Sequence, residues 1–456
     1  MIKTPLTQFE SDLREVATAF GVDDTLEIKH IFKESEDRLV NTFVIKGQSY
    51  AYGNLVPKNR DEIVNKRLIK RYAKLSLYKA LSRVLGKELP WGALTGIRPT
   101  KLAYAELENS GEFEEFFTDV MKVSKEKTQL VKDILKTQKG IYEKNQDNTD
   151  FFAFIPFCPS RCAYCSFISA DVKSAKKHIE DYVETLIDEI DKSACLVKKL
   201  RSIYIGGGTP VSLSNKHLDK ILCAIDKINT GVEYTVEAGR PDVINKENLK
   251  ILKDHGVTRI CVNPQTFNQK TLDLIGRKHT ESDIVEKFLM AKELFQVNMD
   301  LIAGLEGETF EDFKYSLEKA ISLNPENITV HTLCLKKGAE LKKGVERLSV
   351  SQIEDMVTYS HTALKNAGYN PYYLYRQKYM AGNLENTGYA KPNNECVYNV
   401  DVMEEISNVV ACGANAISKK LFNGGERIER LAAPKDVITY LAKEKNIVER
   451  KIELFL

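Results

Sequence analysis

Three cysteines, Cys158, Cys162 and Cys165, lie in the segment FIPFCPSRCAYCSF with the spacing C-x3-C-x2-C. Cysteine thiolates bind zinc and iron–sulfur clusters. A structural zinc site usually needs four ligands in two pairs. No second pair follows, because the other six cysteines are isolated at 195, 223, 261, 334, 396 and 412. Three thiolates on one loop can hold three irons of a 4Fe-4S cluster and leave the fourth iron open to a ligand. The spacing therefore favours an iron–sulfur cluster over zinc or three unrelated core cysteines.

The cysteine loop follows the first of six short apolar segments that predict β-strands. These segments are 151–155, 202–205, 234–237, 259–263, 297–302 and 328–332. Amphipathic helical patterns separate them, most clearly at 178–190, where apolar residues recur every three or four positions. Strands that alternate with helices form parallel βα units. Six units are too few for a closed eight-fold barrel, so the sequence predicts an α/β fold with an open, partial (βα)6 barrel.

Polar groups follow the ends of these predicted strands, where the active site of a βα barrel lies. The first strand ends in the cysteine loop, and the others lead to Gly206–Pro210, Glu237, Gln265, Asp300, and the pair His331 and Thr332. Arg277 follows Gln265 after one loop and helix and could reach back as an anion clamp. Taken singly, each of these residues is as easily a turn, cap or core residue. Their shared position predicts a ligand site.

Composition changes divide the chain into three predicted domains. The pattern of residues 1–148 predicts an α+β domain. Within this domain we expect Asp61–Gly86 to form a helix, whose basic face is either exposed to solvent or docks an acidic partner. The polar segment EKNQDNTD (143–150) marks the boundary to the partial barrel, 149–345. Residues 346–456 predict a mostly helical C-terminal extension that covers the barrel.

Length and composition narrow the possible classes of function. The 456 residues carry 66 Lys and Arg against 64 Asp and Glu, a formal charge of +2, which argues against a nucleic-acid binder. No apolar run approaches the roughly 18 residues of a membrane span, and the N-terminal residues lack the apolar core of a signal peptide. We therefore expect a cytoplasmic, monomeric enzyme whose cysteines serve a metal, catalysis or the core.

The C-x3-C-x2-C spacing, with Tyr164 before the last cysteine, resembles the signature of the radical S-adenosyl-L-methionine (SAM) superfamily. The resemblance implies that Cys158, Cys162 and Cys165 are the catalytic metal ligands of a 4Fe-4S cluster whose open iron binds SAM. In that superfamily the reduced cluster cleaves SAM to a radical that removes a hydrogen from the substrate. The cofactor supplies this chemistry, and the protein positions and shields it.

Further segments resemble the oxygen-independent coproporphyrinogen III oxidase (coproporphyrinogen dehydrogenase) family, specifically its Z-type branch, over nearly the whole chain. They are IPFCPSRCAYCSF, YIGGGTP, NPQTFNQKTLDLIGRKHT, MDLIAGLEGET, WGALTGIRPTK, LYRQKYMAGNLENTGYAKP and NTGYAKPNNECVYN with ACGANAIS. The resemblance implies a radical SAM oxidoreductase of heme (porphyrin) biosynthesis. Its substrate would be a tetrapyrrole, coproporphyrinogen III, its product protoporphyrinogen IX, and its electron donor a protein such as flavodoxin. The resemblance also implies SAM contacts from Gly207, Gly208, Thr209, Pro210, Glu237, Gln265, Arg277 and Asp300.

Three departures from the family pattern leave the reaction open. Phe167 stands where the well-studied oxidases have a further cysteine, and the same Phe occurs in the heme-chaperone relatives. Phe152 and Phe154 stand where those oxidases have a Tyr and a His before the cysteine loop. The pair Tyr398-Asn399 stands in place of a His-Asn pair.

Two alternatives to the decarboxylase therefore remain. The first is a heme chaperone, with an axial heme ligand at His331, His279 or Cys412. The second is another radical SAM enzyme that acts on heme. If the substrate is the four-carboxylate tetrapyrrole, Arg376 and Lys378 are candidate partners for its carboxylates.

Overall fold

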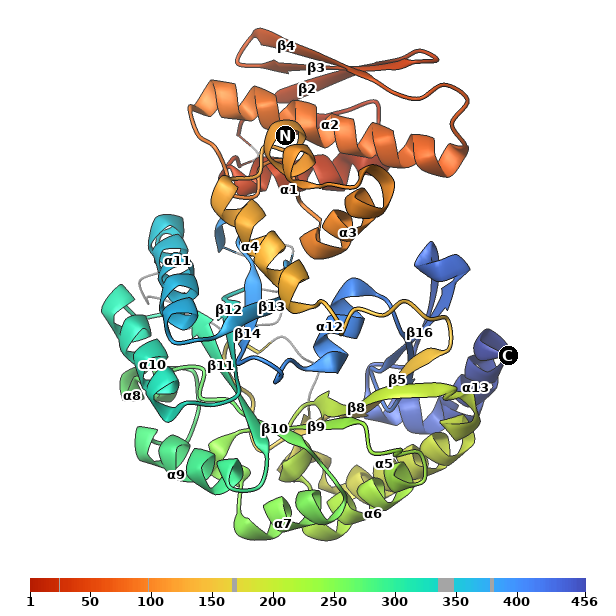
Figure 1. Ribbon diagram of the computed structural model, residues 1–456, viewed down its shortest axis with the longest axis vertical. Helices are drawn as coiled ribbons and strands as arrows, with labels where there is room; N and C mark the ends of the chain where they lie inside the picture. The colour runs from red at the N-terminus through yellow and green to blue at the C-terminus, as the bar shows by residue number, and fades with distance from the viewer. Residues whose placement is uncertain (24, 97, 166–169, 335–347, 378–380) are drawn as a thin grey trace. The chain divides into compact units, whose positions relative to one another are not determined.

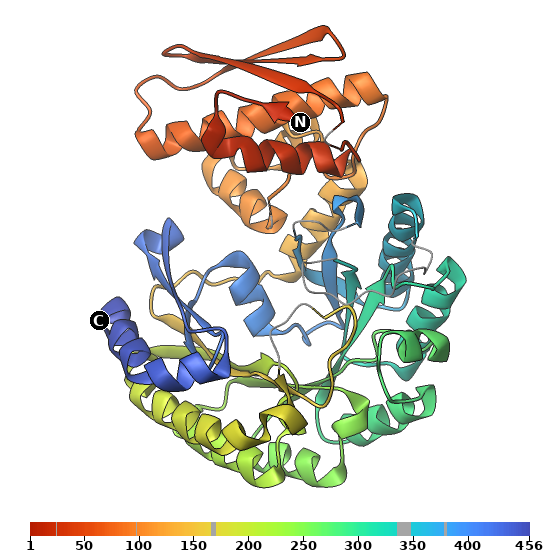
Figure 2. The same cartoon turned by 180° about the vertical axis from the view of Figure 1, so that it is seen from behind.

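The computed structural model describes residues 1–23, 25–96, 98–165, 170–334, 348–377 and 381–456 (Figures 1 and 2). The chain forms two compact units, one of Met1–Lys132 with Tyr375–Glu385 and one of Asp133–Leu374 with Asn386–Leu456. This division falls before the border predicted near 148, because the buried Gln138 side chain donates to Tyr372 O and Glu404 Oε1 of the second unit. The organisation into three domains stays a prediction.

The first unit combines a four-stranded sheet with helices. In sheet order, its strands are β1 (Ile2–Lys3), β2 (Ile28–Glu34), β3 (Arg38–Ile45) and β4 (Gln48–Leu55). Its helices include α1 (Glu10–Ala19), α2 (Glu62–Leu85), α3 (Pro99–Ser110) and the first part of α4 (Lys125–Thr137). The helix predicted at Asp61–Gly86 is α2: Asp61 caps its start by accepting a hydrogen bond from Val64 N, and Gly86 ends it in a left-handed conformation.

An eleven-stranded sheet forms the centre of the second unit, in the order β13-β14-β12-β11-β10-β9-β8-β5-β15-β16-β17. Six adjacent strands in it are parallel: β5 (Asn148–Ile155), β8 (Lys199–Gly207), β9 (Glu233–Gly239), β10 (Arg259–Val262), β11 (Gln296–Ala303) and β12 (Asn327–Thr332). They coincide with the six predicted strands and follow one another in chain order. The predicted partial barrel is confirmed, since β13 and β17 form the two edges of the sheet among the described residues and do not pair with each other.

Helices cover the outer side of this curved sheet (Figures 1 and 2). They are α5 (Val172–Ser193), α6 (Asn215–Asp226), α7 (Lys246–Asp254), α8 (Gln269–Leu274), α9 (Glu281–Lys292) and α10 (Phe310–Leu323). The helix predicted at 178–190 is the centre of α5, and its apolar face, including Ile179, Val183 and Leu186, is buried. None of the described helices combines the length and the low charge that crossing a bilayer requires. Because each helix lies between consecutive parallel strands, the loops at the carboxyl ends of the strands meet at one edge.

The segment after residue 345 extends both edges of the barrel sheet. Its strands are β13 (Asn370–Tyr375), β14 (Asn386–Ala390), β15 (Asn408–Cys412), β16 (Ile417–Phe422) and β17 (Arg427–Ala432), and its helices are α11 (Val350–Asn366), α12 (Val397–Glu404) and α13 (Val437–Phe455). β14 pairs antiparallel with β12, and β15 pairs parallel with β5. The prediction of a mostly helical extension is only partly right, because the helices are accompanied by five strands that were not expected. Two of them pair with barrel strands far away in the sequence, which a local pattern does not show.

A buried ion pair fastens the C-terminal helix to the barrel. Glu189 of α5 and Lys451 of α13 are enclosed, with Oε1 and Nζ 2.7 Å apart. The second carboxylate oxygen accepts hydrogen bonds from Tyr440 Oη at 2.6 Å and from Gly413 N at 2.7 Å. Lys451 Nζ also donates to Ser193 Oγ at 3.1 Å. Both charges are therefore compensated. The ion pair lies beside the end of β15, and β15 pairs with β5, the strand that leads into the cysteine loop.

Replacing Lys451 by Met tests this anchor. The Lys451→Met variant should lose about 3–5 kcal/mol of unfolding free energy, because Glu189 stays buried without its cation. Chemical denaturation followed by circular dichroism measures the loss. The Lys250→Met variant is the matched control, since Lys250 and its partner Asp254 are both exposed and such a pair contributes little. Equal stability of the two variants would contradict the anchoring role.

Candidate functional site

The cysteine loop forms a short arc directly after β5. Cys165 N donates to Cys162 O at 3.0 Å, which closes a tight turn. Ala163 N donates to Ile275 O at 3.0 Å and ties the same turn to a neighbouring loop. Cys158, Cys162 and Cys165 carry thiols rather than disulfides, as do all other cysteines of the chain. The loop therefore presents three thiol groups from one fixed piece of backbone.

Thr209 and Arg240 approach the sulfur atoms of this loop. Thr209 Oγ1 lies 3.6 Å from Cys158 Sγ. Arg240 Nη1 lies 3.9 Å from Cys162 Sγ and also donates to the carbonyl and hydroxyl oxygens of Ser160, at 3.1 and 2.7 Å. Donors of this kind stabilise the negative charge of metal-bound sulfur and adjust the potential of a cluster.

The sequence pattern did not indicate Arg240. Its side chain is buried, and Asp242 holds the guanidinium through two hydrogen bonds, Nε to Oδ1 at 2.9 Å and Nη2 to Oδ2 at 2.7 Å. The signal that the sequence did offer for Arg240 was its position directly after β9, the strand that carries Glu237. A single arginine after a strand has no distinctive spacing, so only the fold brings it to the cysteine loop.

The end of β8 packs main chain against main chain with the start of the cysteine loop. Gly208 N donates to Ile155 O at 2.7 Å, and Thr209 N donates to Phe157 O at 2.7 Å. A Cβ atom on Gly208 would lie 2.4 Å from Phe157 O, so only glycine fits there. Pro210 is buried directly after these residues. The backbone expected to contact SAM is therefore also the backbone that holds the loop.

Glu237 lies beside this backbone. Its Oε1 accepts a hydrogen bond from Tyr204 Oη at 2.7 Å, and a Cβ atom on Gly206 would lie 3.0 Å from its Cδ. Burial raises the pKa of Glu237 to about 7, and the negative charge of Asp300 adds to the rise, while Tyr204 and the backbone of Gly207 oppose it. Glu237 thus changes charge near neutral pH, which is typical of residues at functional sites.

Gln265 and Asp300 meet at the neighbouring strand ends. Gln265 N donates to Asp300 O at 2.9 Å, and Gln265 has a left-handed backbone with φ of 68°. Its buried Oε1 has no hydrogen-bond partner among the described residues. Asp300 Oδ1 accepts from Asn298 Nδ2 at 2.7 Å, and Oδ2 lies 3.6 Å from His331 Nε2. A strained residue with an unpartnered buried oxygen indicates a position that a ligand completes.

Arg277 reaches back toward the cysteine loop, as expected. It is buried, and Nη2 donates to Tyr164 Oη at 2.9 Å while Nη1 donates to Asn263 O at 2.5 Å. Burial by itself would lower the pKa of Arg277, but Tyr164 and Cys162 nearby raise it, so the guanidinium stays charged. Nε has no hydrogen-bond partner in the part of the chain that the structure describes. A buried cation with an unused donor suits an anionic group such as a carboxylate.

Arg376 has its own hydrogen-bond partners inside the first unit. It lies in the first unit, is 1% exposed, and donates from Nη1 to Leu94 O at 2.5 Å and from Nε and Nη2 to Asn383 O at 3.2 and 2.8 Å. The prediction that Arg376 binds a substrate carboxylate is therefore wrong, because backbone carbonyls occupy its buried guanidinium. Lys378, the other candidate, and Phe167 lie outside the described residues.

Two of the three candidate heme ligands are also enclosed. Cys412 is fully buried with Sγ 3.4 Å from Lys451 Nζ, and burial raises the pKa of its thiol to about 12. His279 is 1% exposed beside Asp242. Neither side chain can contact heme without opening the core, so these two predictions are wrong. His331 is half-buried at the end of β12 and keeps an accessible surface.

Two of the positions that depart from the family pattern meet in space. Tyr204 and Tyr398 stack with ring centroids 4.3 Å apart, and Phe152 lies 6.0 Å from Tyr398 and 6.1 Å from Tyr204. We call these three residues the aromatic cluster. Each of the three residues is half-buried. Because Tyr204 also donates to Glu237, the aromatic cluster adjoins the polar site.

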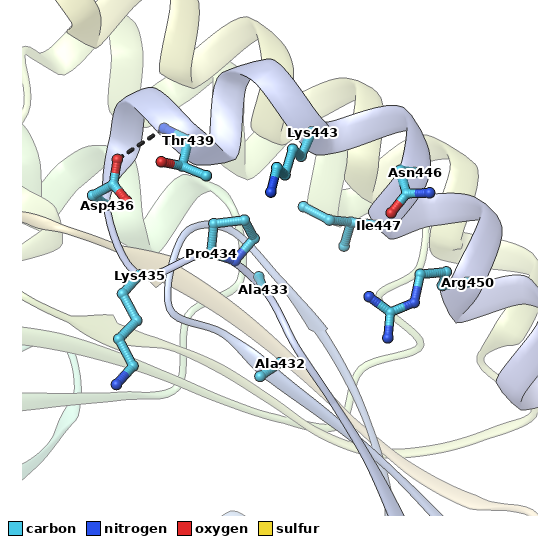
Figure 3. A pocket seen from close by; sticks show the side chains of 10 residues that line it. All are labelled: Ala432, Ala433, Pro434, Lys435, Asp436, Thr439, Lys443, Asn446, Ile447 and Arg450. Atoms are coloured by element: carbon cyan, nitrogen blue, oxygen red, sulfur yellow. Dashed lines mark hydrogen bonds between the residues drawn. The ribbon is translucent and has the colours of Figure 1, made fainter.

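A separate surface hollow of about 400 Å³ lies between α13 and the preceding loop, 432–436. Figure 3 shows Lys443, Ile447 and Arg450 reaching from α13 toward this loop. The hollow shares no residue with the strand-end site. The hollow is therefore distinct from the strand-end site.

The comparisons with known proteins agree with this geometry. The model of the radical SAM superfamily matches residues 152–320. The oxygen-independent coproporphyrinogen-III oxidase-like protein HemZ of Bacillus subtilis is 34% identical over 401 residues, which cover 84% of this chain and 79% of HemZ. This chain belongs to the radical SAM superfamily, in the family of oxygen-independent coproporphyrinogen-III oxidase-like proteins.

Other relatives of this radical SAM protein carry different descriptions. The heme chaperone HemW of Lactococcus lactis is 37% identical over 235 residues, which cover 49% of this chain and 60% of HemW. The structure of coproporphyrinogen III oxidase (HemN) from Escherichia coli matches with a TM-score of 0.55 at 22% identity, covering 68% of this chain and 71% of HemN. The match to HemN shows a shared fold and confirms the predicted α/β class.

The cofactors of this radical SAM protein are those of its superfamily, a 4Fe-4S cluster and SAM. When bound and reduced, the cluster supplies the electron that turns SAM into a radical source. We infer that Cys158, Cys162 and Cys165 hold the cluster. We infer further that SAM is contacted by Gly207, Gly208, Thr209, Pro210, Glu237, Gln265, Arg277 and Asp300. The site fits both groups, because it offers three thiols on one loop and the unpartnered Gln265 Oε1 and Arg277 Nε.

Replacing Cys162 tests the cluster assignment. The Cys162→Ser variant should retain far less iron and sulfide than the wild type, because two thiolates do not hold the cubane firmly. Iron and sulfide per chain are measured after anaerobic reconstitution. Cys195→Ser is the matched control, since Cys195 is an exposed cysteine outside the loop. Wild-type iron in Cys162→Ser would remove Cys162 from the ligand set.

Glu237 should make SAM binding depend on pH. Its carboxylate fraction rises about tenfold between about pH 6 and 8 with a pKa near 7, and the ionised form attracts the SAM ammonium. The SAM affinity of cluster-loaded protein, measured by calorimetry, should therefore rise with pH. Glu237→Gln should bind SAM more weakly, keep its iron and lose the pH dependence. A wild-type dissociation constant that does not change over this range would exclude Glu237 from the SAM site.

Proposed function

We propose that this radical SAM protein catalyses the oxygen-independent oxidative decarboxylation of coproporphyrinogen III to protoporphyrinogen IX. The observation that carries the proposal is the similarity to the oxidase-like protein HemZ over 84% of this chain. That similarity extends well beyond the superfamily segment 152–320. A shared radical SAM core alone therefore does not explain the full length of the similarity to HemZ.

The proposed reaction converts two propionate side chains into vinyl groups. Each propionate loses a hydrogen atom, carbon dioxide and one electron, so a site for it needs a radical source and an enclosed surface for an apolar macrocycle. The aromatic cluster of Phe152, Tyr204 and Tyr398 supports this role, because half-buried aromatic rings suit the face of a tetrapyrrole. The hydrogen bond from Tyr204 to Glu237 links the aromatic cluster to the carboxyl that we assign to SAM.

A heme chaperone is the second candidate function. It is favoured by the HemW relatives, one of them 37% identical over about half of this chain. It is also favoured by His331, which is half-buried at the strand ends beside Asp300. In this role His331 would ligate heme iron, and no decarboxylated product would form.

An anaerobic turnover separates these functions. Full-length reconstituted protein is mixed with SAM, coproporphyrinogen III and either dithionite or flavodoxin, the donor that we propose. We expect 5′-deoxyadenosine together with porphyrins that have lost one or two carboxyl groups, detected by mass spectrometry. Cys162→Ser should form neither product, and Cys195→Ser should form both.

The other outcomes overturn the decarboxylase proposal in distinct ways. Deoxyadenosine without a decarboxylated porphyrin would indicate another substrate, with heme as the first to try. No deoxyadenosine from protein with an intact cluster, together with heme binding that His331→Ala weakens, would establish the chaperone function instead.

A further inference from the structure

A cluster of metal-binding side chains lies on the outer helices, apart from the cysteine loop. Asp219 and Cys223 of α6 and His255 at the end of α7 each offer one ligand atom, and these three atoms lie within 4.8 Å of one another. Asp219 and Cys223 are four residues apart, so they share one face of α6. Figure 1 shows α6 and α7 on the outer side of the sheet. We call Asp219, Cys223 and His255 the α6–α7 cluster.

The imidazole ring of His255 lies between two carboxylates. Nδ1 is 2.6 Å from Asp226 Oδ2, and Nε2 is 3.0 Å from Asp219 Oδ1. Burial would lower the pKa of His255, but the hydrogen bonds to both aspartates outweigh it and raise the pKa. Two negative oxygens therefore face opposite edges of one ring. Such a ring is stable with a proton on each nitrogen, or with one proton and a metal ion.

We propose that the α6–α7 cluster binds Zn²⁺ or a similar borderline-soft divalent ion. A nitrogen, a thiolate sulfur and a carboxylate oxygen are the ligand types that zinc uses in proteins. His255 Nε2, Cys223 Sγ and one oxygen of Asp219 supply one of each. Three protein ligands leave one tetrahedral position for water.

Asp226 completes the site from outside the ligand set. A histidine that binds zinc commonly donates its other ring N–H to a carboxylate, which fixes the tautomer and orients the ring. The contact of His255 Nδ1 with Asp226 has this arrangement. It directs the lone pair of Nε2 toward Asp219 and Cys223, where the metal would lie.

Cys223 distinguishes this site from an ordinary ion pair. The two aspartates suffice to pair with a protonated His255, and the thiol adds nothing to that pairing. Zinc binding instead displaces the thiol proton of Cys223 and any proton on Nε2. The ion would link α6 directly to α7, two neighbouring helices of the barrel.

Zinc content per chain tests the proposal. Full-length protein carrying its iron–sulfur cluster is dialysed anaerobically against buffered Zn²⁺, and bound zinc and iron are measured by mass spectrometry. The wild type should hold about one more zinc ion per chain than Cys223→Ser or His255→Gln. Cys195→Ser, which changes an exposed cysteine outside the α6–α7 cluster, should match the wild type. Any zinc that the cysteine loop takes up is common to all four proteins and cancels in the difference.

Two further measurements do not depend on those variants. Zn²⁺ should slow the alkylation of Cys223 by iodoacetamide in the wild type and leave that of Cys195 unchanged. Asp226→Asn should keep the site but weaken zinc binding about 10- to 100-fold. Equal zinc in the wild type, Cys223→Ser and His255→Gln would overturn the proposal. An alkylation rate of Cys223 that zinc does not change would also overturn it and leave His255 in a simple ion pair.

Discussion

Two main-chain hydrogen bonds hold the start of the cysteine loop against the end of β8, from Gly208 N to Ile155 O and from Thr209 N to Phe157 O. They require the two backbones to approach more closely than any side chain at Gly208 would permit. Because main-chain bonds do not depend on side-chain rotamers, they give the three sulfurs a fixed base. What matters for Glu237, Arg240 and Arg277 is their position relative to the three sulfurs.

The opposite side of β5 is held by side chains from the C-terminal segment and α5. Tyr182 Oη donates to Phe154 O at 2.7 Å, one residue before β5 ends. Gly413, just after β15, donates to Glu189, which is paired with Lys451 of the last helix. Residues from the end of the chain thus support the strand from which the cysteine loop begins. The late segment is part of the barrel sheet and helps to position its site.

The polar groups around Glu189 and those at the strand ends differ in how fully their partners satisfy them. Around Glu189 and Lys451 each charge has several partners, which is the arrangement expected of a structural ion pair. At the strand ends the opposite holds: Glu237 has a raised pKa, and Gln265 combines a left-handed backbone with an unpartnered oxygen. Groups that the protein leaves incompletely satisfied are those that a ligand can satisfy.

The amino-acid sequence alone determined the six parallel strands, the cysteine triad and the row of polar residues at the strand ends. Periodicity and spacing are local, and parallel βα units bring all their strand ends to one edge, so these features need no knowledge of distant contacts. Only the tertiary structure decided that Arg240 reaches Cys162, that Phe152 meets Tyr398, and that Arg376 and Cys412 are enclosed. Each of those facts depends on residues far apart in the chain. A local pattern shows which residues are polar or aromatic, but packing selects their neighbours and sets their exposure to ligand.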